Sequence, residues 1–327
     1  MNSFGAFKGR NLTNNPRWLG LTSCQAAYAR IGPDMTADLV TPVLRWYDTH
    51  ARDLPWRRPG ASPWSVLVSE FMLQQTPVAR VLPAHQAWLA RWPVPQSLAA
   101  ATPGDAVRQW DRLGYPRRAL RLHATARVLT DQYAGEVPAS VPELAGLPGV
   151  GSYTAAAVAS FAFGQRHAVL DTNVRRVLGR LVRGEQVPSA GATAAERRLA
   201  ESLLPAAPPR AARWSVAVME LGALVCTAAR PRCDSCPVAR HCAWRLAGRP
   251  AGPGRPPAAR YAGSDRECRG QLLAMLRQAA GPVPAARLDA AWPAQDQRER
   301  ALATLIADGL AVPAGTGCYG LPTQPGR

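Results

Sequence analysis

The chain has 327 residues, which is enough for two or three compact domains with buried cores. Its 39 lysines and arginines outnumber 22 aspartates and glutamates, and the formal net charge is +17. This charge favours a polyanionic partner such as nucleic acid, although arginine-rich codon usage would give a similar balance. No long uncharged apolar run and no signal peptide appear, which argues against a membrane or secreted protein, and we expect a cytoplasmic one.

The first segment, residues 1–36, has no sustained hydrophobic period and contains turn signals such as Asn14-Asn15-Pro16. We expect a disordered leader here. Met35 stands just before the first well-patterned segment, so a start of translation at Met35 is an alternative.

From residue 37 to residue 246, helix-length apolar patterns alternate with proline and glycine, and strand-like alternation is scarce. The pattern predicts an all-α protein. Residues 247–263 are rich in proline, glycine and arginine and are typical of a linker. Residues 264–322 read as three helices followed by a glycine-punctuated ribbon, which predicts a small winged-helix-like (α+β) domain.

Ser62 and Pro63 are typical of a helix start, and the helix that they predict carries two polar side chains of interest. Glu70 and Gln74 are four residues apart and therefore share one side of this helix, away from the centre of its apolar stripe. Taken alone, Glu70 is more typical of a solvated surface acid than of a catalyst.

The segment LPGVGSYTAAAV, residues 147–158, begins with two glycines and ends with small helix-forming residues. Gly149 and Gly151 permit a tight turn, and they let backbone N–H groups approach a phosphate at the helix start. An ordinary helix connector is the alternative. The first large polar side chain after the turn is Tyr153.

Asp171 follows an apolar run and precedes a helix that starts with Thr172. It is either a plain N-cap or a fixed negative charge. The two interpretations are compatible, because the N–H groups and the dipole at a helix N-terminus favour an ionised carboxylate.

Four cysteines have the spacing C-x6-C-x2-C-x5-C within seventeen residues, which is the strongest single signal in the chain: Cys226, Cys233, Cys236 and Cys242. Disulfides are not expected in a cytoplasmic chain. One close pair flanked by two single cysteines suits a loop wound around a compact iron–sulfur cluster, and a zinc ion is the alternative.

Together these features resemble the helix-hairpin-helix DNA glycosylases, and within them the branch that removes adenine mispaired with 8-oxoguanine. The resemblance rests on five segments in the family's order: SEFMLQQT (69–76), LGYPRRALRL (113–122), LPGVGSYTAAAV (147–158), LDTNVRRVL (170–178) and the four-cysteine loop.

The resemblance implies two helical lobes with DNA across the cleft between them. Residues 61–165 would form a six-helix lobe with the helix-hairpin-helix, and residues 37–60 and 166–246 would form a lobe in which the four cysteines hold a [4Fe–4S] cluster. Family members often add a Nudix-like domain, and residues 264–322 do not have that pattern. We expect 8-oxoguanine to be discriminated more weakly or by another route.

The resemblance also implies a chemistry in which the target nucleotide is flipped out of the duplex. Glu70 would protonate adenine, and Asp171 would stabilise the positive charge that develops on the sugar, while Tyr153 and Asn173 would support them. In the endonuclease III branch a lysine stands where this chain has Tyr153, and no lysine follows Lys8. We therefore expect a monofunctional hydrolase without β-lyase activity.

The expected partner is double-stranded DNA with adenine opposite 8-oxoguanine or guanine, bound by a monomer associated with the nucleoid. A thymine or uracil mismatch glycosylase and a catalytically silent iron–sulfur DNA-binding protein are the alternatives. A core aromatic is the alternative for Tyr115, and a helix-packing amide for Gln75. The remaining expected DNA contacts come from the helix end, the hairpin and the cysteine loop: Gln74, Gln75, Tyr115, Leu147, Gly149, Val150, Gly151, Arg230 and Arg232.

Overall fold

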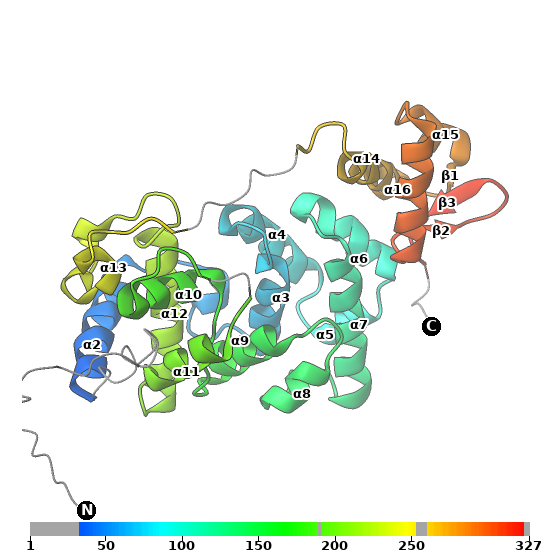
Figure 1. Cartoon of the computed structure of the whole chain (residues 1–327). Coiled ribbons are helices and arrows are strands. Elements are labelled where there is room, and N and C mark those ends of the chain that lie inside the picture. The colour runs from blue at the N-terminus through cyan, green and yellow to red at the C-terminus, as the bar shows by residue number, and fades with distance from the viewer. Residues whose placement is uncertain (1–32, 189–190, 253–259, 324–327) are drawn as a thin grey trace, which may run out of the picture.

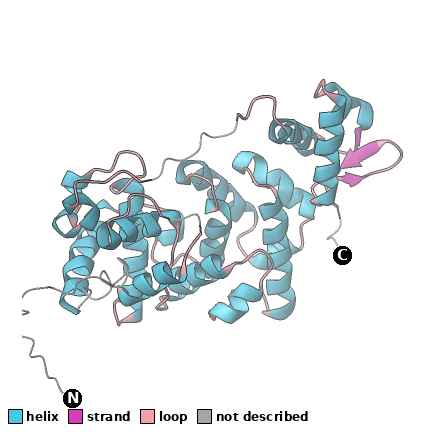
Figure 2. Cartoon of the chain, in the orientation of Figure 1, coloured by secondary structure: helices cyan, strands magenta, loops and turns pink. Residues whose placement is uncertain are grey.

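The computed structural model describes residues 33–188, 191–252 and 260–323. Its helices form two lobes and a small C-terminal domain (Figure 1). The lobe that contains residues 63–163, which we call the first lobe, lies between the other lobe and the C-terminal domain. Strands occur only in the C-terminal domain of the described chain (Figure 2). In those ranges no helix has the length and apolar character needed to cross a membrane.

The first lobe contains seven α-helices where six were expected, because a five-residue helix begins at Pro95. Proline at an early position also starts several of the other helices, where its fixed φ and its missing N–H cost little. The helices are α3 (Pro63–Leu73), α4 (Val78–Arg91), α5 (Pro95–Ala99), α6 (Pro103–Trp110), α7 (Arg117–Gln132), α8 (Val141–Gly146) and α9 (Ser152–Phe163).

Tryptophans dominate the core of this lobe. Trp88 is fully buried and meets Trp92 and Trp110 edge-on, with ring centroids 4.6 and 5.6 Å apart. Such edge-to-face pairs add to the area that they bury. Leu54 and Trp56 belong to the same core, so the first lobe's packing begins before residue 61, the start expected from the sequence.

The second lobe joins the N-terminal helix to the segment after α9, and it packs a separate core. Its helices are α2 (Pro33–His50), α10 (Thr172–Leu178), α11 (Ala194–Ser202), α12 (Pro208–Leu224) and α13 (Ala243–Leu246). Because α2 starts at Pro33, the last residues of the expected leader are helical. The rest of the leader lies outside the described residues.

Residues 264–322 form the predicted three helices and ribbon: α14 (Asp265–Gln278), α15 (Ala285–Ala290), α16 (Gln295–Ala307), and the strands β1 (Val283–Pro284), β2 (Val312–Pro313) and β3 (Cys318–Gly320). The three strands pair antiparallel in the order β1-β3-β2. Val283 lies opposite Tyr319, and Val312 lies opposite Gly320. The fold class predicted from the sequence is confirmed.

The C-terminal domain is docked on the first lobe. Its buried leucines, such as Leu272 and Leu276, belong to the same hydrophobic cluster as the first lobe's tryptophans. Gly104 on α6 donates its N–H to the carbonyl of Pro322 at 2.7 Å. A Cβ atom at Gly104 would lie 2.6 Å from that oxygen, so only glycine permits this approach.

Candidate active site

Glu70 lies on α3 at the junction of the lobes, and only 4 % of its surface is exposed. The interpretation as a solvated surface acid is therefore wrong. Burial raises the pKa of Glu70 to about 7; the nearby negative charge of Asp171 also raises it, and a hydrogen bond with Tyr153 and the charge of Arg57 lower it. A carboxyl group with this pKa is partly protonated at neutral pH, as a general acid must be.

Tyr153 comes from the first turn of α9, directly after the glycine hairpin. Its hydroxyl hydrogen-bonds with Glu70. Burial, followed by the charges of Glu70 and Asp171, raises the pKa of Tyr153 well above its usual value. The phenol therefore stays protonated and donates to the Glu70 carboxylate.

Asp171 is the N-cap of α10, as the sequence predicted, and its carboxylate accepts two hydrogen bonds. Oδ1 accepts from the backbone N–H of Val174 at 2.6 Å, and Oδ2 accepts from Nδ2 of Asn173 at 2.7 Å. Burial raises the pKa of Asp171, although both hydrogen bonds and the charge of Arg176 act in the opposite direction. The expected stabilisation of the anion by the helix N-terminus is present, and desolvation outweighs it.

A chain of hydrogen bonds connects Asp171 to the four-cysteine loop. Oδ1 of Asn173 accepts from Nη2 of Arg176 at 2.7 Å, and Nε of Arg176 donates to the carbonyl of Cys226 at 2.7 Å. Gly222 on α12 permits these hydrogen bonds, because it lets Asn173 pack closely against α12. A Cβ at position 222 would lie 2.7 Å from the Cβ of Asn173. The orientation of Asp171 therefore depends on the loop.

The structure adds a buried ion network that our reading of the sequence missed. Glu220 on α12 is fully buried and lies 2.7 Å from Arg52 and 2.7 Å from Arg57. Those partners outweigh desolvation and lower the pKa of Glu220 to about 2. Arg57 in turn lowers the pKa of Glu70. A lone glutamate within the apolar helix WSVAVMELGAL was the available signal.

The two glycines of the hairpin have different conformations. Gly149 has φ +79°, and a Cβ there would lie 2.8 Å from the Cβ of Arg121, so the turn requires glycine. Gly151 has φ −89°, and no atom lies within 4 Å of its Cβ position. Leu147 and Val150 are buried in the core of the first lobe, so their side chains cannot contact DNA and only their backbone groups remain for that role.

Gln75 and Tyr115 lie on loops and line the same pocket. Both are exposed and have positive φ, 55° for Gln75 and 48° for Tyr115, a conformation that is unfavourable for residues with a Cβ. Gln75 follows the end of α3 and is not part of its packed stripe, and Tyr115 is 54 % exposed. Interpretation of these residues as a packing amide and a core aromatic is wrong. Gln74 is the half-buried C-cap of α3.

The four predicted cysteines line one small pocket, together with Arg180 and Trp244. None of the four forms a disulfide bond. Arg180 is buried over the ring of Trp244, donates to the carbonyls of Thr227 and Ala228, and lies 3.5 Å from Sγ of Cys226. The loop is thus held with its sulfurs facing one cavity.

The arrangement of these sulfurs bears on the kind of group that they fit. A single zinc ion binds sulfur at about 2.3 Å, which brings its ligands within about 4 Å of one another. In the described part of the chain, no three Cys, His, Asp or Glu side chains are grouped as one ion needs. Four cysteines around one pocket are a donor set that zinc and iron–sulfur clusters both use.

Arg230 and Arg232 lie in this loop, between Cys226 and Cys233, and both are exposed. The guanidinium of Arg232 donates to the carbonyl of Leu224, with Nε at 3.1 Å, whereas the backbone carbonyl of Arg230 accepts from Thr227. Both arginines therefore lie on the surface beside the cysteine pocket.

Comparison with known proteins places the chain in a family. Residues 68–202 match the HhH-GPD superfamily of base excision DNA repair proteins. The adenine DNA glycosylase of Mycobacterium tuberculosis is 51 % identical over 297 residues, covering 90 % of this chain and 96 % of that protein. The human adenine DNA glycosylase is 42 % identical over 212 residues, covering 62 % of this chain and 38 % of that protein.

Solved structures agree on the fold. A thermostable thymine-DNA glycosylase matches with a TM-score of 0.57 and 26 % identity, covering 65 % of this chain and 98 % of that one. A trapped endonuclease III–DNA covalent intermediate matches with a TM-score of 0.55 and 23 % identity, covering 70 % of this chain and 99 % of that one. With this fold and this degree of identity to its relatives, the chain belongs to the adenine DNA glycosylase family of the helix-hairpin-helix DNA repair superfamily.

Proposed function

We propose that this protein is a monofunctional DNA glycosylase that hydrolyses the bond between adenine and deoxyribose where adenine faces 8-oxoguanine or guanine. The observation that carries the proposal is the buried Glu70, whose pKa of about 7 makes it an acid at neutral pH. The names of the curated relatives support adenine as the base.

In the proposed reaction the carboxyl proton of Glu70 moves to N7 of a flipped-out adenine. The C1′–N9 bond then breaks, and its electron pair leaves with the base. The positive charge that remains on the sugar is stabilised by Asp171, which Asn173 orients at 2.7 Å. Water adds to C1′ and gives its proton to the Glu70 carboxylate, which restores the acid. Tyr153 holds the Glu70 carboxylate in place between these steps.

The part of the chain that the structure describes contains no lysine, which supports a monofunctional reaction. A β-lyase needs an amine that attacks the sugar, and no lysine follows Lys8 in the sequence. Tyr153 stays protonated, since its pKa is raised, and a neutral phenol is a poor nucleophile. The strand should therefore remain intact after the base is removed.

The proposed DNA contacts comprise phosphate binding at the hairpin backbone from Leu147 to Gly151, and at Arg230 and Arg232. They also include a wedge of Gln75 and Tyr115, beside Gln74, that offsets the loss of stacking. The strained backbone of both wedge residues supports this role. We propose that the protein acts as a monomer.

We infer that Cys226, Cys233, Cys236 and Cys242 hold a [4Fe–4S] cluster. When bound, the cluster supplies four strong iron–thiolate bonds that close the loop, and no redox step is needed for hydrolysis. Burial raises the pKa of the Cys236 thiol to about 11, so a metal is needed to keep it as a thiolate. Through Arg176, the loop's position reaches Asp171.

A panel of duplexes tests the function. Purified protein is incubated with DNA that contains A opposite 8-oxoguanine, A opposite G, T opposite G, or thymine glycol, and each sample is divided with and without hot alkali. We expect strand breaks only at adenine and only after alkali. Breaks without alkali would refute the monofunctional reaction, and breaks only at thymine would refute adenine as the substrate.

A further inference from the structure

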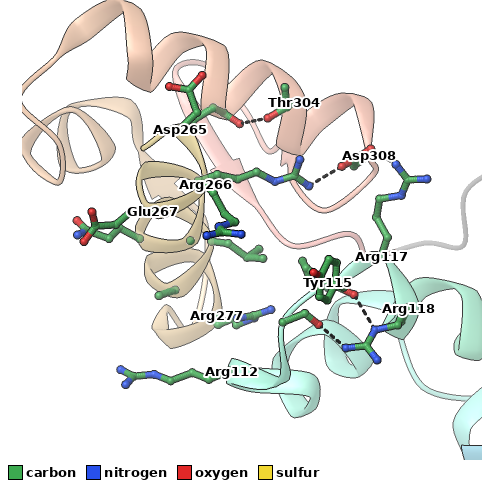
Figure 3. A pocket seen from close by; sticks show the side chains of 18 of the residues that line it. Arg112, Tyr115, Arg117, Arg118, Asp265, Arg266, Glu267, Arg277, Thr304 and Asp308 are labelled. Atoms are coloured by element: carbon green, nitrogen blue, oxygen red, sulfur yellow. Dashed lines mark hydrogen bonds and ion pairs between the residues drawn. The ribbon is translucent and has the colours of Figure 1, made fainter. Parts of the chain in front are cut away.

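A broad groove with a volume of about 1790 Å³ lies beside the contact between the C-terminal domain and the first lobe, and both line it (Figure 3). One wall is the loop from Asp111 to Arg118 together with Gln75, and the other wall comes from α14 and α16. We call it the arginine groove because nine arginines line it: Arg80, Arg112, Arg117, Arg118, Arg121, Arg266, Arg269, Arg277 and Arg300. Glu70, Tyr153 and Asp171 do not line it.

The arginine groove carries positive charge that its own acids do not neutralise. Four carboxylates line it against the nine arginines. Asp308 pairs with Arg117 at 3.0 Å and with Arg269 at 2.5 Å, and Asp265 pairs with Arg300 at 3.5 Å. These pairs leave a clear excess of cations.

Several groove arginines have no ion pair within the described part of the chain: Arg80, Arg112, Arg121 and Arg266. Arg112 and Arg266 are exposed, and they come from opposite walls of the groove, Arg112 from the first lobe and Arg266 from α14 (Figure 3). Guanidinium groups of this kind bind phosphate oxygens, and each such contact releases counterions from DNA.

Fixed contacts hold the two walls at one separation. Nε of Arg108 donates to the carbonyl of Arg277 at 3.0 Å, and Nε of Arg277 donates to the carbonyl of Val107 at 3.1 Å. The Gly104–Pro322 contact and the shared hydrophobic core close the same interface. The groove is therefore built into the folded protein and does not need a domain movement to form.

The size and position of the arginine groove suit a polymer. Small-molecule pockets have volumes of about 300–1,000 Å³, which is well below that of this groove. Gln75, which follows the end of the helix that carries Glu70, lines the groove together with Tyr115, whereas the buried Glu70 and Asp171 do not. In the proposed function the target nucleotide goes to the acids, so the duplex strand on the other side of this wedge is the one that faces the groove.

We propose that the arginine groove binds the sugar-phosphate backbone of the DNA strand opposite the one that loses its adenine. The contacts are to phosphate and do not read bases. The proposal rests on the proposed function for the assignment of the strand. It gives the C-terminal winged-helix-like domain the role of a second, sequence-independent DNA clamp.

The test compares Arg112→Gln/Arg266→Gln with Arg287→Gln, an exposed arginine of α15 that does not line the groove. Binding to a fluorescent matched duplex and to an A·8-oxoguanine duplex is measured across a salt series. For the double variant we expect Kd to rise about tenfold for both duplexes and the salt slope to fall by about 2, with neither change in the control. Thermal unfolding should be unchanged, because both side chains are exposed.

A second arm assigns the strand. Neutral methylphosphonate linkages replace phosphates either on the adenine strand or on the opposite strand. We expect the variant's defect to vanish only when the opposite strand is neutral. A Kd within about twofold of wild type, a defect confined to 8-oxoguanine DNA, or a defect that vanishes with a neutral adenine strand would each overturn the proposal. Because matched DNA is bound without turnover, a failure of the adenine reaction would be seen separately, in the excision assay.

Discussion

The two lobes reach stability in different ways. The first lobe packs tryptophans and aliphatic side chains around Trp88 and shares that core with the C-terminal domain. The second lobe has an apolar core too, but buried arginines link its last segments by donating to backbone carbonyls, among them Arg176 to Cys226 and Arg180 to Thr227. A lobe whose loop depends on hydrogen bonds and thiols needs a cofactor more than one with a continuous apolar core does.

The same difference divides the active site. Glu70 is desolvated by the first lobe's core, whereas Asp171 is oriented by the second lobe through Asn173. The pKa of Glu70 therefore depends on packing. The orientation of Asp171 depends on a series of hydrogen bonds that ends at the cysteine loop. Changes in the first lobe should alter proton transfer from Glu70, and changes in the cysteine loop should alter the structure of the second lobe, which holds Asp171.

The largest expected effect is on Glu70. Replacing it in Glu70→Gln removes the proton donor but keeps its size, so single-turnover adenine release should fall by about 10³-fold with little change in thermal stability. Glu136→Gln, an exposed glutamate of the same lobe, is the matched control and should retain full activity. Full activity in Glu70→Gln would remove Glu70 from the mechanism.

Next in size is the loss of the cysteine loop. Cys236→Ser should lose bound iron and the associated visible absorbance, and the second lobe should then unfold in a separate, earlier transition because the first lobe keeps its core. Iron analysis and calorimetry measure the two effects. Cys318→Ser, a thiol outside the loop, is the control. A single, unshifted transition would show that the second lobe does not depend on the loop.

A smaller effect is expected at the hairpin, where two glycines form a matched pair. Gly149→Ala should destabilise the first lobe by about 2 kcal/mol, because its φ is positive and the new methyl group meets Arg121. Gly151→Ala should leave stability unchanged and weaken DNA binding, since its methyl group would occupy open space beside the backbone N–H groups. Equal melting temperatures for both variants would contradict the conclusion that the turn requires glycine at position 149 and not at position 151.

The smallest effect is a shift in the pH profile. In the proposed reaction protonated Glu70 is the active form, so the rate of adenine release should fall as pH rises through about 7. The hydrogen bond from Tyr153 lowers the pKa of Glu70, and Tyr153→Phe should therefore move this falling limb upward by about one pH unit. Single-turnover rates of adenine release, measured for both proteins from acid to alkaline pH, give the size of this shift. A downward shift would mean that Tyr153 does not donate to Glu70.

Much of the site could be predicted because its residues act through local geometry. The N-cap role of Asp171 and the helix start at Ser62 follow from short-range hydrogen bonds, and the structure has both. The ring of four cysteines likewise follows from spacing within a single loop. Each of these features involves residues close together in the chain.

Other features could not be predicted, because they depend on segments far apart in the chain. The burial of Glu70 requires the apolar neighbours that surround α3, and its raised pKa follows from that burial. The pairing of Glu220 with Arg52 and Arg57 joins residues more than 160 positions apart. The exposure of Gln75 could not be predicted, because α3 ends at Leu73 and leaves Gln75 on the following loop and not on the helix.

The sequence by itself determined the helical class, the glycine hairpin, the cysteine loop, and the three helices and ribbon of the C-terminal domain, because periodicity, capping and turn chemistry act over a few residues. Only the tertiary structure decided which carboxyl group has its pKa raised to about 7 and where the positive charge gathers. Desolvation and charge excess depend on what surrounds a side chain, and distant segments supply those surroundings: α9 and α10 around Glu70, and α14 and α16 across from Arg112.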